Sequence, residues 1–366
     1  MKFHLIGGFL GSGKTTAIIG AARHLIAQGK RVGVVTNDQG RYLVDTAFFQ
    51  AANLPTVEVT GGCFCCNYDD LGARLSQLKD SAQPDVIFAE SVGSCADVVA
   101  TVIRPFLELG TANLSLDTFT VFTDARLLRR RLLDEPMPFS DDIVYIFDKQ
   151  IEEANLLILN KADLLSPQQA SDTARLAEAR FPGKTIRLQD SRQPEQIAAW
   201  IALLDSGAIA PPRAGVEIDY QRYGTGEAQL AWVDEEVRFE VPEGAARGVV
   251  LAFIGAIADL IDAQRASIGH VKFMARGNEP AQDMKISLPT LAEPDWQERV
   301  PAIPGTQVTL MVNARVEISA QALRELIGRA AQQAAAEAGA TWRESHVSAF
   351  HPAFPRIPES LRLRDS

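Results

Sequence analysis

Nine residues near the start of the chain, Gly8 to Thr16, read GFLGSGKTT and have the types and spacing needed to bind phosphate. They match the form G-x-x-x-x-G-K-[ST], between an apolar run from Phe3 to Ile6 and a helical pattern from Ala17 to Ala27. The glycines allow backbone N–H groups to surround a polyphosphate, and the helix N-terminus adds partial positive charge. The sequence therefore predicts a nucleoside triphosphate site formed by Gly8, Gly11, Ser12, Gly13, Lys14, Thr15 and Thr16.

A second polar motif, Asn160-Lys161-x-Asp163, follows the apolar run from Leu156 to Leu159. The Asp163 carboxylate can accept hydrogen bonds from N1–H and the exocyclic amino group of guanine, whereas adenine has no such pair of donors. The stem of Lys161 can lie over the base, and Asn160 can tie this loop to the phosphate loop. The motif therefore selects GTP.

Two further segments are expected to respond to the nucleotide. Glu90 ends a predicted strand, where a Mg²⁺-linked acid is expected, and the N–H of Gly93 can sense the γ-phosphate. Asp38 and Asp45 lie after the second predicted strand, where a first switch is expected. Ser94 follows Gly93 in place of a water-positioning glutamine, so intrinsic turnover should be slow, roughly 10⁻⁴–10⁻² s⁻¹ by analogy.

Three of the four cysteines, Cys63, Cys65 and Cys66, fall within four residues and follow two glycines. Three thiolates aimed at one point suit a borderline ion such as Zn²⁺, with the fourth position left open for transfer. The alternatives are a redox switch, buried structural cysteines, and an iron–sulfur cluster that would need Cys95 as fourth ligand. Transferable metal binding is the favoured interpretation.

These motifs must be positioned by a parallel sheet, because apolar strand-like runs alternate with helical patterns through the first half of the chain. The predicted fold class is α/β, a P-loop NTPase sheet with helices on both faces, followed by a smaller α+β domain. The second half has the order of a split-βαβ sandwich with one extra strand. The predicted organisation is a GTPase domain at 1–205, a linker at 206–227, the α+β domain at 228–355 and a tail at 356–366.

The composition excludes several classes of partner. The 366 residues carry a net charge of −10, which argues against nucleic acid or an anionic membrane surface. No apolar run approaches the roughly 18 residues of a membrane span. The phosphate loop begins too early for a cleaved signal peptide to precede it, so a cytoplasmic location is expected.

The motifs together, in this order, resemble those of the CobW-type GTPases, relatives of the urease and hydrogenase nickel-insertion GTPases. The resemblance covers about the first 200 residues. It implies that GTP binding and hydrolysis are coupled to holding or releasing a metal ion at the C-x-C-C loop, and that the metal or a metal cofactor is delivered to a client protein. The residues that carry it are Gly8 to Thr16, Gly61 to Cys66, Glu90 with Gly93, and Asn160 to Asp163.

Two features depart from the family pattern. After Asn37-Asp38-Gln39-Gly40, many members carry a glutamate that can ligate metal, whereas this chain has Arg41, whose charge disfavours a nearby cation. The segment from Glu90 to Asp97, read ESVGSCAD, replaces the commoner glycine-leucine-alanine-acid-proline continuation and resembles a subgroup associated with corrinoid-dependent methyl transfer.

The predicted function is therefore a GTPase of the metallochaperone type, forming GDP and phosphate. Lys14, Thr15 and Glu90 are the predicted catalytic residues, with Mg²⁺ held by Thr15 and Glu90. The transferred ion is Zn²⁺, with Co²⁺ and Ni²⁺ as alternatives, and the partners are a client metalloprotein and a second copy of the chain as a homodimer. One alternative is a GTP-switched assembly factor for a corrinoid or other cofactor enzyme, with structural cysteines; another is a small-molecule kinase.

Overall fold

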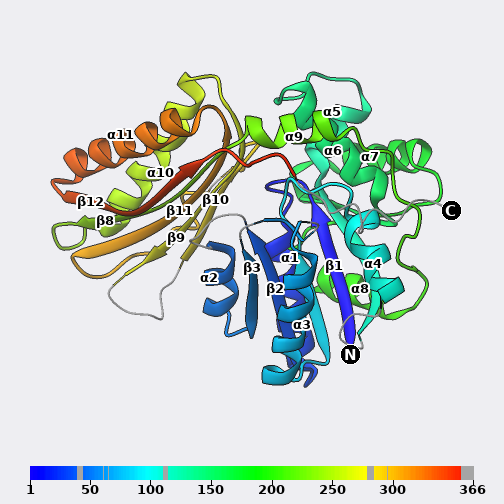
Figure 1. Cartoon of the computed structure of the whole chain (residues 1–366). Helices are drawn as coiled ribbons and strands as arrows, with labels where there is room; N and C mark the ends of the chain where they lie inside the picture. The colour runs from blue at the N-terminus through cyan, green and yellow to red at the C-terminus, as the bar shows by residue number, and fades with distance from the viewer. Residues whose placement is uncertain are drawn as a thin grey trace. The chain divides into compact units, whose positions relative to one another are not determined.

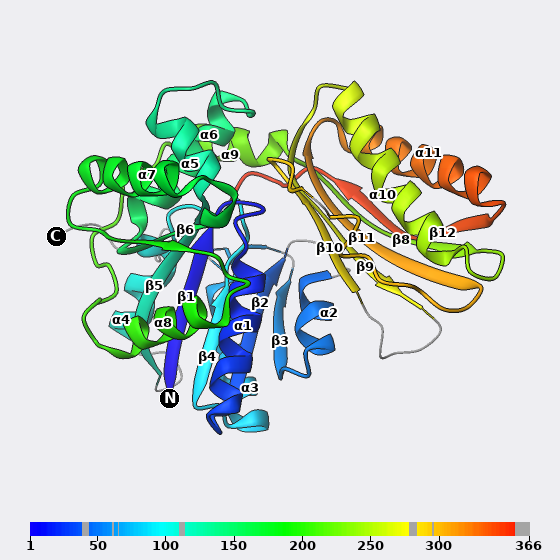
Figure 2. The same cartoon turned by 180° about the vertical axis from the view of Figure 1, so that it is seen from behind.

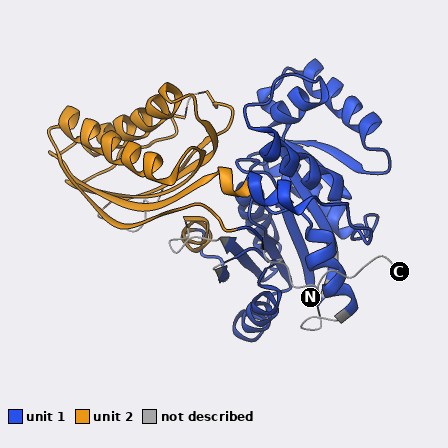
Figure 3. Cartoon of the chain, turned by 45° about the horizontal axis from the view of Figure 1, so that its top comes forward, with its two compact units in different colours: residues 1–39, 52–226, 354–366 blue, residues 40–51, 227–353 orange. Residues whose placement is uncertain are grey.

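The computed structural model describes residues 1–38, 44–60, 62–64, 66–109, 114–277, 284–294 and 296–355. The chain divides into two compact units: residues 1–39, 52–226 and 354–366, and residues 40–51 and 227–353 (Figure 3). The main boundary falls one residue from the predicted one. The predicted linker, 206–227, instead ends within α9 (Tyr220–Gln229), the helix that crosses the boundary, and residues 40–51, expected in the first domain, belong to the second. The predicted tail lies outside the described residues.

The first unit is built on a seven-stranded sheet in the order β3-β2-β4-β1-β5-β6-β7, in which every neighbouring pair is parallel. Strands β4 and β6 are buried along their whole length and apolar up to their last residues, Glu90 and Asn160, as expected for a sheet covered on both faces. The strands are β1 (Lys2–Gly8), β2 (Val32–Asp38), β3 (Thr56–Thr60), β4 (Val86–Glu90), β5 (Ser115–Asp124), β6 (Leu156–Asn160) and β7 (Thr185–Gln189).

Helices cover both faces of this sheet, because the strand order reverses direction between β3 and β4 and crossovers between parallel strands are almost always right-handed. Helices α1 and α8 pack together on one face, seen in Figure 2, and α3 and α4 lie on the face seen in Figure 1. The predicted fold class of this half is confirmed. The helices are α1 (Lys14–Ala27), α3 (Tyr68–Ala82), α4 (Arg104–Leu109), α5 (Ala125–Leu132), α6 (Asp141–Glu153), α7 (Pro167–Arg180), α8 (Pro194–Asp205) and α9 (Tyr220–Gln229), with a π-helical turn η1 (Val99–Ile103) and a 3-10 turn η2 (Ala162–Leu164).

The second unit is a five-stranded antiparallel sheet in the order β10-β9-β11-β8-β12. Without the edge strand β10, this is the order of a split-βαβ sandwich, so the predicted extra strand is β10. Its elements are β8 (Ala231–Glu240), α10 (Ala246–Ala263), β9 (Ser267–Arg276), β10 (Met284–Pro289), β11 (Gln307–Glu317), α11 (Ala320–Ala338) and β12 (Thr341–Phe350), together with α2 (Val44–Ala51).

The two faces of this second sheet have different covers. Helices α10 and α11 pack on one face around a core that includes Val271, Phe253 and Phe273 (Figure 1). Lys272 lies between Val271 and Phe273 in β9, so its side chain is on the opposite face. Helix α2 packs against β9 and β11, and Asp45 of α2 contacts Lys272, which places α2 on that opposite face. Among the described residues, no helix is both long enough and apolar enough to cross a membrane.

Candidate nucleotide site and cysteine loop

The phosphate loop joins β1 to α1 through glycines that no other residue could replace without strain. Gly8, Gly11 and Gly13 have φ values of 127°, 70° and 93°, in the left-handed region that side chains rarely adopt. A Cβ atom on Gly8 would lie 2.0 Å from the carbonyl oxygen of Phe122, which is a clash with neighbouring backbone. The sharp turn predicted from the sequence is therefore built into the backbone.

Polar groups of the loop point inward. Lys14 is 6% exposed, and its Nζ donates to the carbonyl oxygens of Gly8 at 2.8 Å and Phe9 at 3.3 Å. Ser12 is 1% exposed, and its Oγ has no hydrogen-bond partner among the described residues. Burying a hydroxyl without a hydrogen-bond partner costs free energy. Phosphate oxygens are acceptors that suit both the Ser12 hydroxyl and the Lys14 ammonium. Thr16, the last residue of the motif, is half-buried in α1.

The predicted magnesium residues are in direct contact. Thr15 Oγ1 donates to Glu90 Oε1 at 3.0 Å, and both residues are buried. The contact arises because β4 pairs with β1, with Glu90 beside Ile6, so the acid ends its strand next to the phosphate loop. A hydroxyl and a carboxylate are hard oxygen ligands of the kind that Mg²⁺ prefers, so this pair fits that ion.

Gly93 lies against the phosphate loop. A Cβ atom at this position would be 2.7 Å from Leu10 Cδ2 and 3.1 Å from Leu10 Cα, so only glycine allows this close approach. Gln150 of α6 holds the segment from Gly93 to Cys95, because its Nε2 donates to the carbonyl oxygens of Gly93 at 3.0 Å and Cys95 at 2.8 Å. Gly93, predicted to sense the γ-phosphate, is thus packed against the loop predicted to hold the phosphates.

Asn160 joins three loops at the end of β6. Its Nδ2 donates to Ser12 O at 2.8 Å, and its Oδ1 accepts from Ser191 N at 3.1 Å and Ser191 Oγ at 2.8 Å. A Cβ atom on Gly13 would lie 2.3 Å from Asn160 Nδ2, so the glycine permits this contact. The hydrogen bond to the phosphate loop that the sequence predicts for Asn160 is therefore present.

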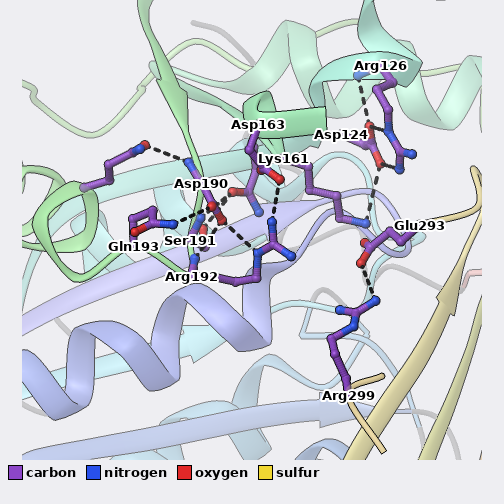
Figure 4. A network of polar contacts seen from close by, with 12 residues as sticks. Asp124, Arg126, Lys161, Asp163, Asp190, Ser191, Arg192, Gln193, Glu293 and Arg299 are labelled. Carbon is purple, nitrogen blue, oxygen red and sulfur yellow. Dashed lines mark hydrogen bonds and ion pairs between the residues drawn. The ribbon is translucent and has the colours of Figure 1, made fainter. Parts of the chain in front are cut away.

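Lys161 and Asp163 belong to a network of ion pairs (Figure 4). Lys161 has a left-handed backbone with φ 59°, and its Nζ lies 3.5 Å from Asp124 Oδ2. The Asp163 carboxylate accepts a hydrogen bond from Arg192 Nη2. Arg192 is oriented in turn by Asp190, whose Oδ1 accepts from Arg192 Nε at 3.1 Å. The carboxylate predicted to read guanine is thus already engaged by a guanidinium.

Sequence reasoning missed Asp190, Ser191 and Arg192. They follow β7, an edge strand of five residues that is mostly half-buried and gave no clear apolar run. The sequence did offer a signal, since residues 190–192 are polar and follow the next strand after Asn160. Neighbouring parallel strands bring their carboxyl ends to one edge, so these residues could have been expected near Asn160.

The cysteine loop begins directly after β3 and makes a tight turn into α3. The carbonyl oxygen of Cys63 accepts from Cys66 N and Asn67 N, both at 3.0 Å, and these hydrogen bonds close the turn. The Sγ atoms of Cys63 and Cys66 lie 3.2 Å apart. Cys63 is disulfide-bonded, whereas Cys66 and the buried Cys95 are not part of a disulfide.

The complete three-cysteine site is not described, because Cys65 lies outside the described residues, as do Gly61 and Arg41. Within the described part of the chain, no group of three or more histidine, cysteine or acidic residues could hold a metal ion. Metal binding by all three cysteines therefore stays a prediction. Its chemistry requires a reduced loop, since only thiolates ligate the metal.

Asp45, which the sequence predicted near the nucleotide, belongs to the second compact unit. It lies in α2, and its carboxylate accepts from Lys272 Nζ at 2.8 and 2.6 Å. Burial alone would raise the pKa of Asp45, but the ammonium groups of Lys272 and Lys285 outweigh it and hold that pKa well below its usual value. The side chain of Asp38, at the end of β2, is outside the described residues.

The family assignment comes from the first half of the chain. Residues 2–187 match the family described as CobW/HypB/UreG, nucleotide-binding domain. The chain belongs to this family. The CobW/HypB/UreG match begins at β1 and ends within β7, so it includes strands β1 to β6, part of β7 and both nucleotide motifs.

Individual relatives have moderate similarity. The chain is 30% identical to the zinc chaperone YeiR of Escherichia coli over 177 residues, 46% of this chain and 48% of that protein. It is 27% identical to the zinc chaperone CobW of a Sinorhizobium species over 220 residues, 53% and 58% of the two chains. Among solved structures, nickel-bound HypB from Helicobacter pylori matches with a TM-score of 0.40 and 18% identity, covering 56% of this chain and 86% of that one. The chain spans about half the length of the two zinc chaperones.

Proposed function

We propose that this protein is a GTP-hydrolysing metallochaperone that holds a divalent ion at Cys63, Cys65 and Cys66 and delivers it to a client protein. The observation that carries the proposal is the placement of three features at the carboxyl edge of one sheet. The phosphate loop follows β1, the Thr15–Glu90 pair joins this loop to the end of β4, and the cysteine loop follows β3. Open parallel sheets bind their ligands at this edge.

The nucleotide half of the proposal assigns each group a task. Lys14 and the loop amides hold the phosphates, and Asp163 with Asn160 selects guanine. Magnesium held by Thr15 and Glu90 would neutralise charge that develops on the phosphates. No glutamine is available after Gly93, so hydrolysis is expected to be slow. The zinc chaperone names of the similar proteins support the second half of the proposal.

The decisive experiment is a metal titration of the reduced protein, with Zn²⁺, in the presence and absence of GTP. We expect one equivalent to bind through thiolates, with an affinity that depends on the nucleotide. Cys66→Ser should weaken binding at least tenfold, whereas Cys95→Ser, at a buried thiol outside the loop, should not change it. If reduced wild-type protein binds no Zn²⁺ but still hydrolyses GTP, the metallochaperone proposal is wrong and an assembly factor with structural cysteines takes its place.

A further inference from the structure

Asn37, near the end of β2, contacts the cysteine loop on both sides of Cys63. Its Nδ2 donates to the carbonyl oxygen of Gly62 at 2.7 Å, and its Oδ1 accepts from the N–H of Phe64 at 2.9 Å. The same Nδ2 donates to Val59 O at 3.2 Å, at the end of β3. One carboxamide thus satisfies backbone groups immediately before and after a predicted metal ligand.

The position of this carboxamide is itself fixed. Asn37 is 8% exposed and lies in the interior of the sheet, where β2 pairs with β3 on one side and β4 on the other. Asn37 is opposite Val59 in the β2–β3 pair, and the preceding residue, Thr36, is opposite Glu90 in the β2–β4 pair. A side chain held on central strands gives a more rigid support than one on a loop.

The loop needs such support because its own backbone offers little. Gly62 has no side chain, and a Cβ atom there would lie 2.8 Å from Asn67 Nδ2, so close packing at this point requires glycine. Glycine also leaves the unsupported backbone more conformational freedom than any other residue. On the other side of Cys63, the side chain of Phe64 is buried, and its backbone N–H donates to Asn37 Oδ1.

We propose that Asn37 is a positioning residue for the cysteine loop: its carboxamide holds the backbone on both sides of Cys63 and so sets the direction from which that sulfur meets a thiophilic divalent cation. This proposal rests on the proposed metal-binding function. Groups that orient a metal ligand without touching the metal typically change affinity by about 10–100-fold when they are removed.

The test compares three variants with the wild-type protein, all reduced, using Co²⁺ alone as the probe. Asn37→Ala removes both hydrogen bonds to the loop. Asn37→Asp keeps an acceptor for Phe64 N–H but sets a carboxylate oxygen against the Gly62 carbonyl. Thr36→Val is the matched control, because Thr36 is also buried in the same strand and its hydroxyl donates to Val57 O at 3.5 Å, away from the loop.

We expect Asn37→Ala and Asn37→Asp to lose about 10-fold or more in Co²⁺ affinity and to weaken the thiolate-to-cobalt charge-transfer band, with GTP affinity within twofold of wild type. Thr36→Val should match wild type in all three measurements. Wild-type Co²⁺ affinity and spectrum in Asn37→Ala or Asn37→Asp would overturn the proposal, as would an equal loss of Co²⁺ and GTP binding, which indicates general damage to β2.

A second measurement does not need the metal. Amide hydrogen exchange in the metal-free protein should become faster in the peptide that contains residues 62–67 for Asn37→Ala, and stay unchanged in the phosphate loop. Unchanged exchange at 62–67 would overturn the positioning role even if the variant bound Co²⁺ poorly. A wild-type protein without any thiolate–cobalt band would contradict the proposed function, and the exchange result would then still decide whether Asn37 positions the loop.

Discussion

Asn160 offers the sharpest test of how the nucleotide site is held together. The change Asn160→Ala removes three buried hydrogen bonds: one to the Ser12 carbonyl, and two from the N–H and hydroxyl of Ser191. Asn160 itself is 2% exposed, so water cannot readily replace the lost carboxamide. The variant therefore leaves buried polar groups in the phosphate loop and after β7 without their partner.

The size of the effect follows from those unsatisfied groups. Each buried donor or acceptor that loses its partner costs about 1–3 kcal/mol, and the Ser12 carbonyl and the Ser191 N–H both do. We therefore expect Asn160→Ala to destabilise the loop arrangement by about 2–6 kcal/mol. If only about 1.4 kcal/mol of this appears in nucleotide binding, GTP affinity falls tenfold.

The assay is calorimetric titration of GTP in Mg²⁺, combined with hydrogen exchange of the first-turn amides of α1. Ser191→Ala is the graded control, because it removes the hydroxyl bond to Asn160 and keeps the Ser191 N–H. Its loss of GTP affinity should be smaller than that of Asn160→Ala. An Asn160→Ala protein with GTP affinity within twofold of wild type, and unchanged exchange in α1, would refute the reasoning that this side chain holds the loop.

Three further predictions concern the Thr15–Glu90 pair, the buried Glu153 and the Asp45–Lys272 ion pair. Thr15→Val and Glu90→Gln should each abolish the Mg²⁺-dependent part of GTP affinity, measured as the difference between titrations with Mg²⁺ and with EDTA. Burial raises the pKa of Glu153 from 4.5 to about 8. Between about pH 4.5 and 8 the folded state therefore keeps a proton that the unfolded state has lost. As the pH rises through this window, the free energy of unfolding should fall by up to about 1.4 kcal/mol per pH unit. Glu153→Gln should flatten that slope, measured by hydrogen exchange in α6 from pH 5 to 9. In the second unit, Asp45→Asn should destabilise α2 by about 3–5 kcal/mol, because the buried Lys272 charge loses its partner carboxylate. Adding Lys272→Met to this variant should restore most of the protection of the α2 amides from hydrogen exchange.

The phosphate loop and Asn160 could be predicted because their roles depend on local order along the chain. The three glycines and Lys14 act within one turn, and the pattern therefore carries the geometry with it. Asn160 lies after a strongly apolar strand, and the carboxyl end of such a strand is expected at the ligand edge of a parallel sheet. The glycine loop acts locally, whereas Asn160 reaches Ser12, 148 residues away, because parallel strands bring their carboxyl ends to one edge.

Helix α2 could not be predicted in the same way. Asp45 was interpreted as a loop acid near the nucleotide, because it follows β2 in the sequence. Its partner in the structure, Lys272, is 227 residues further along the chain, and Phe49 of the same helix is fully buried. Contacts with a distant segment, rather than local propensity, decide the place of this helix, and a single sequence does not reveal them.

Asn37 and Asn160 use the same property of the carboxamide, and this yields a last prediction. An amide both donates and accepts, so one side chain can join a carbonyl of one segment to an N–H of another. Asn160 does this between Ser12 and Ser191, and Asn37 does it between Gly62 and Phe64. A carboxylate of the same shape only accepts, so aspartate should fail at both positions.

Among the described residues the two asparagines share no hydrogen-bond partner, so the effects of their variants should add if the nucleotide and cysteine loops are independent. Independent sites add to within about 0.3–0.5 kcal/mol. We expect a larger deviation, because Thr36 beside Asn37 is paired with Glu90, which contacts the phosphate loop. The free energy of GTP binding to Asn37→Ala, Asn160→Ala and the double variant, each with and without Co²⁺, measures this deviation. Strict additivity in both conditions would show that the loops share a sheet edge without communicating through it.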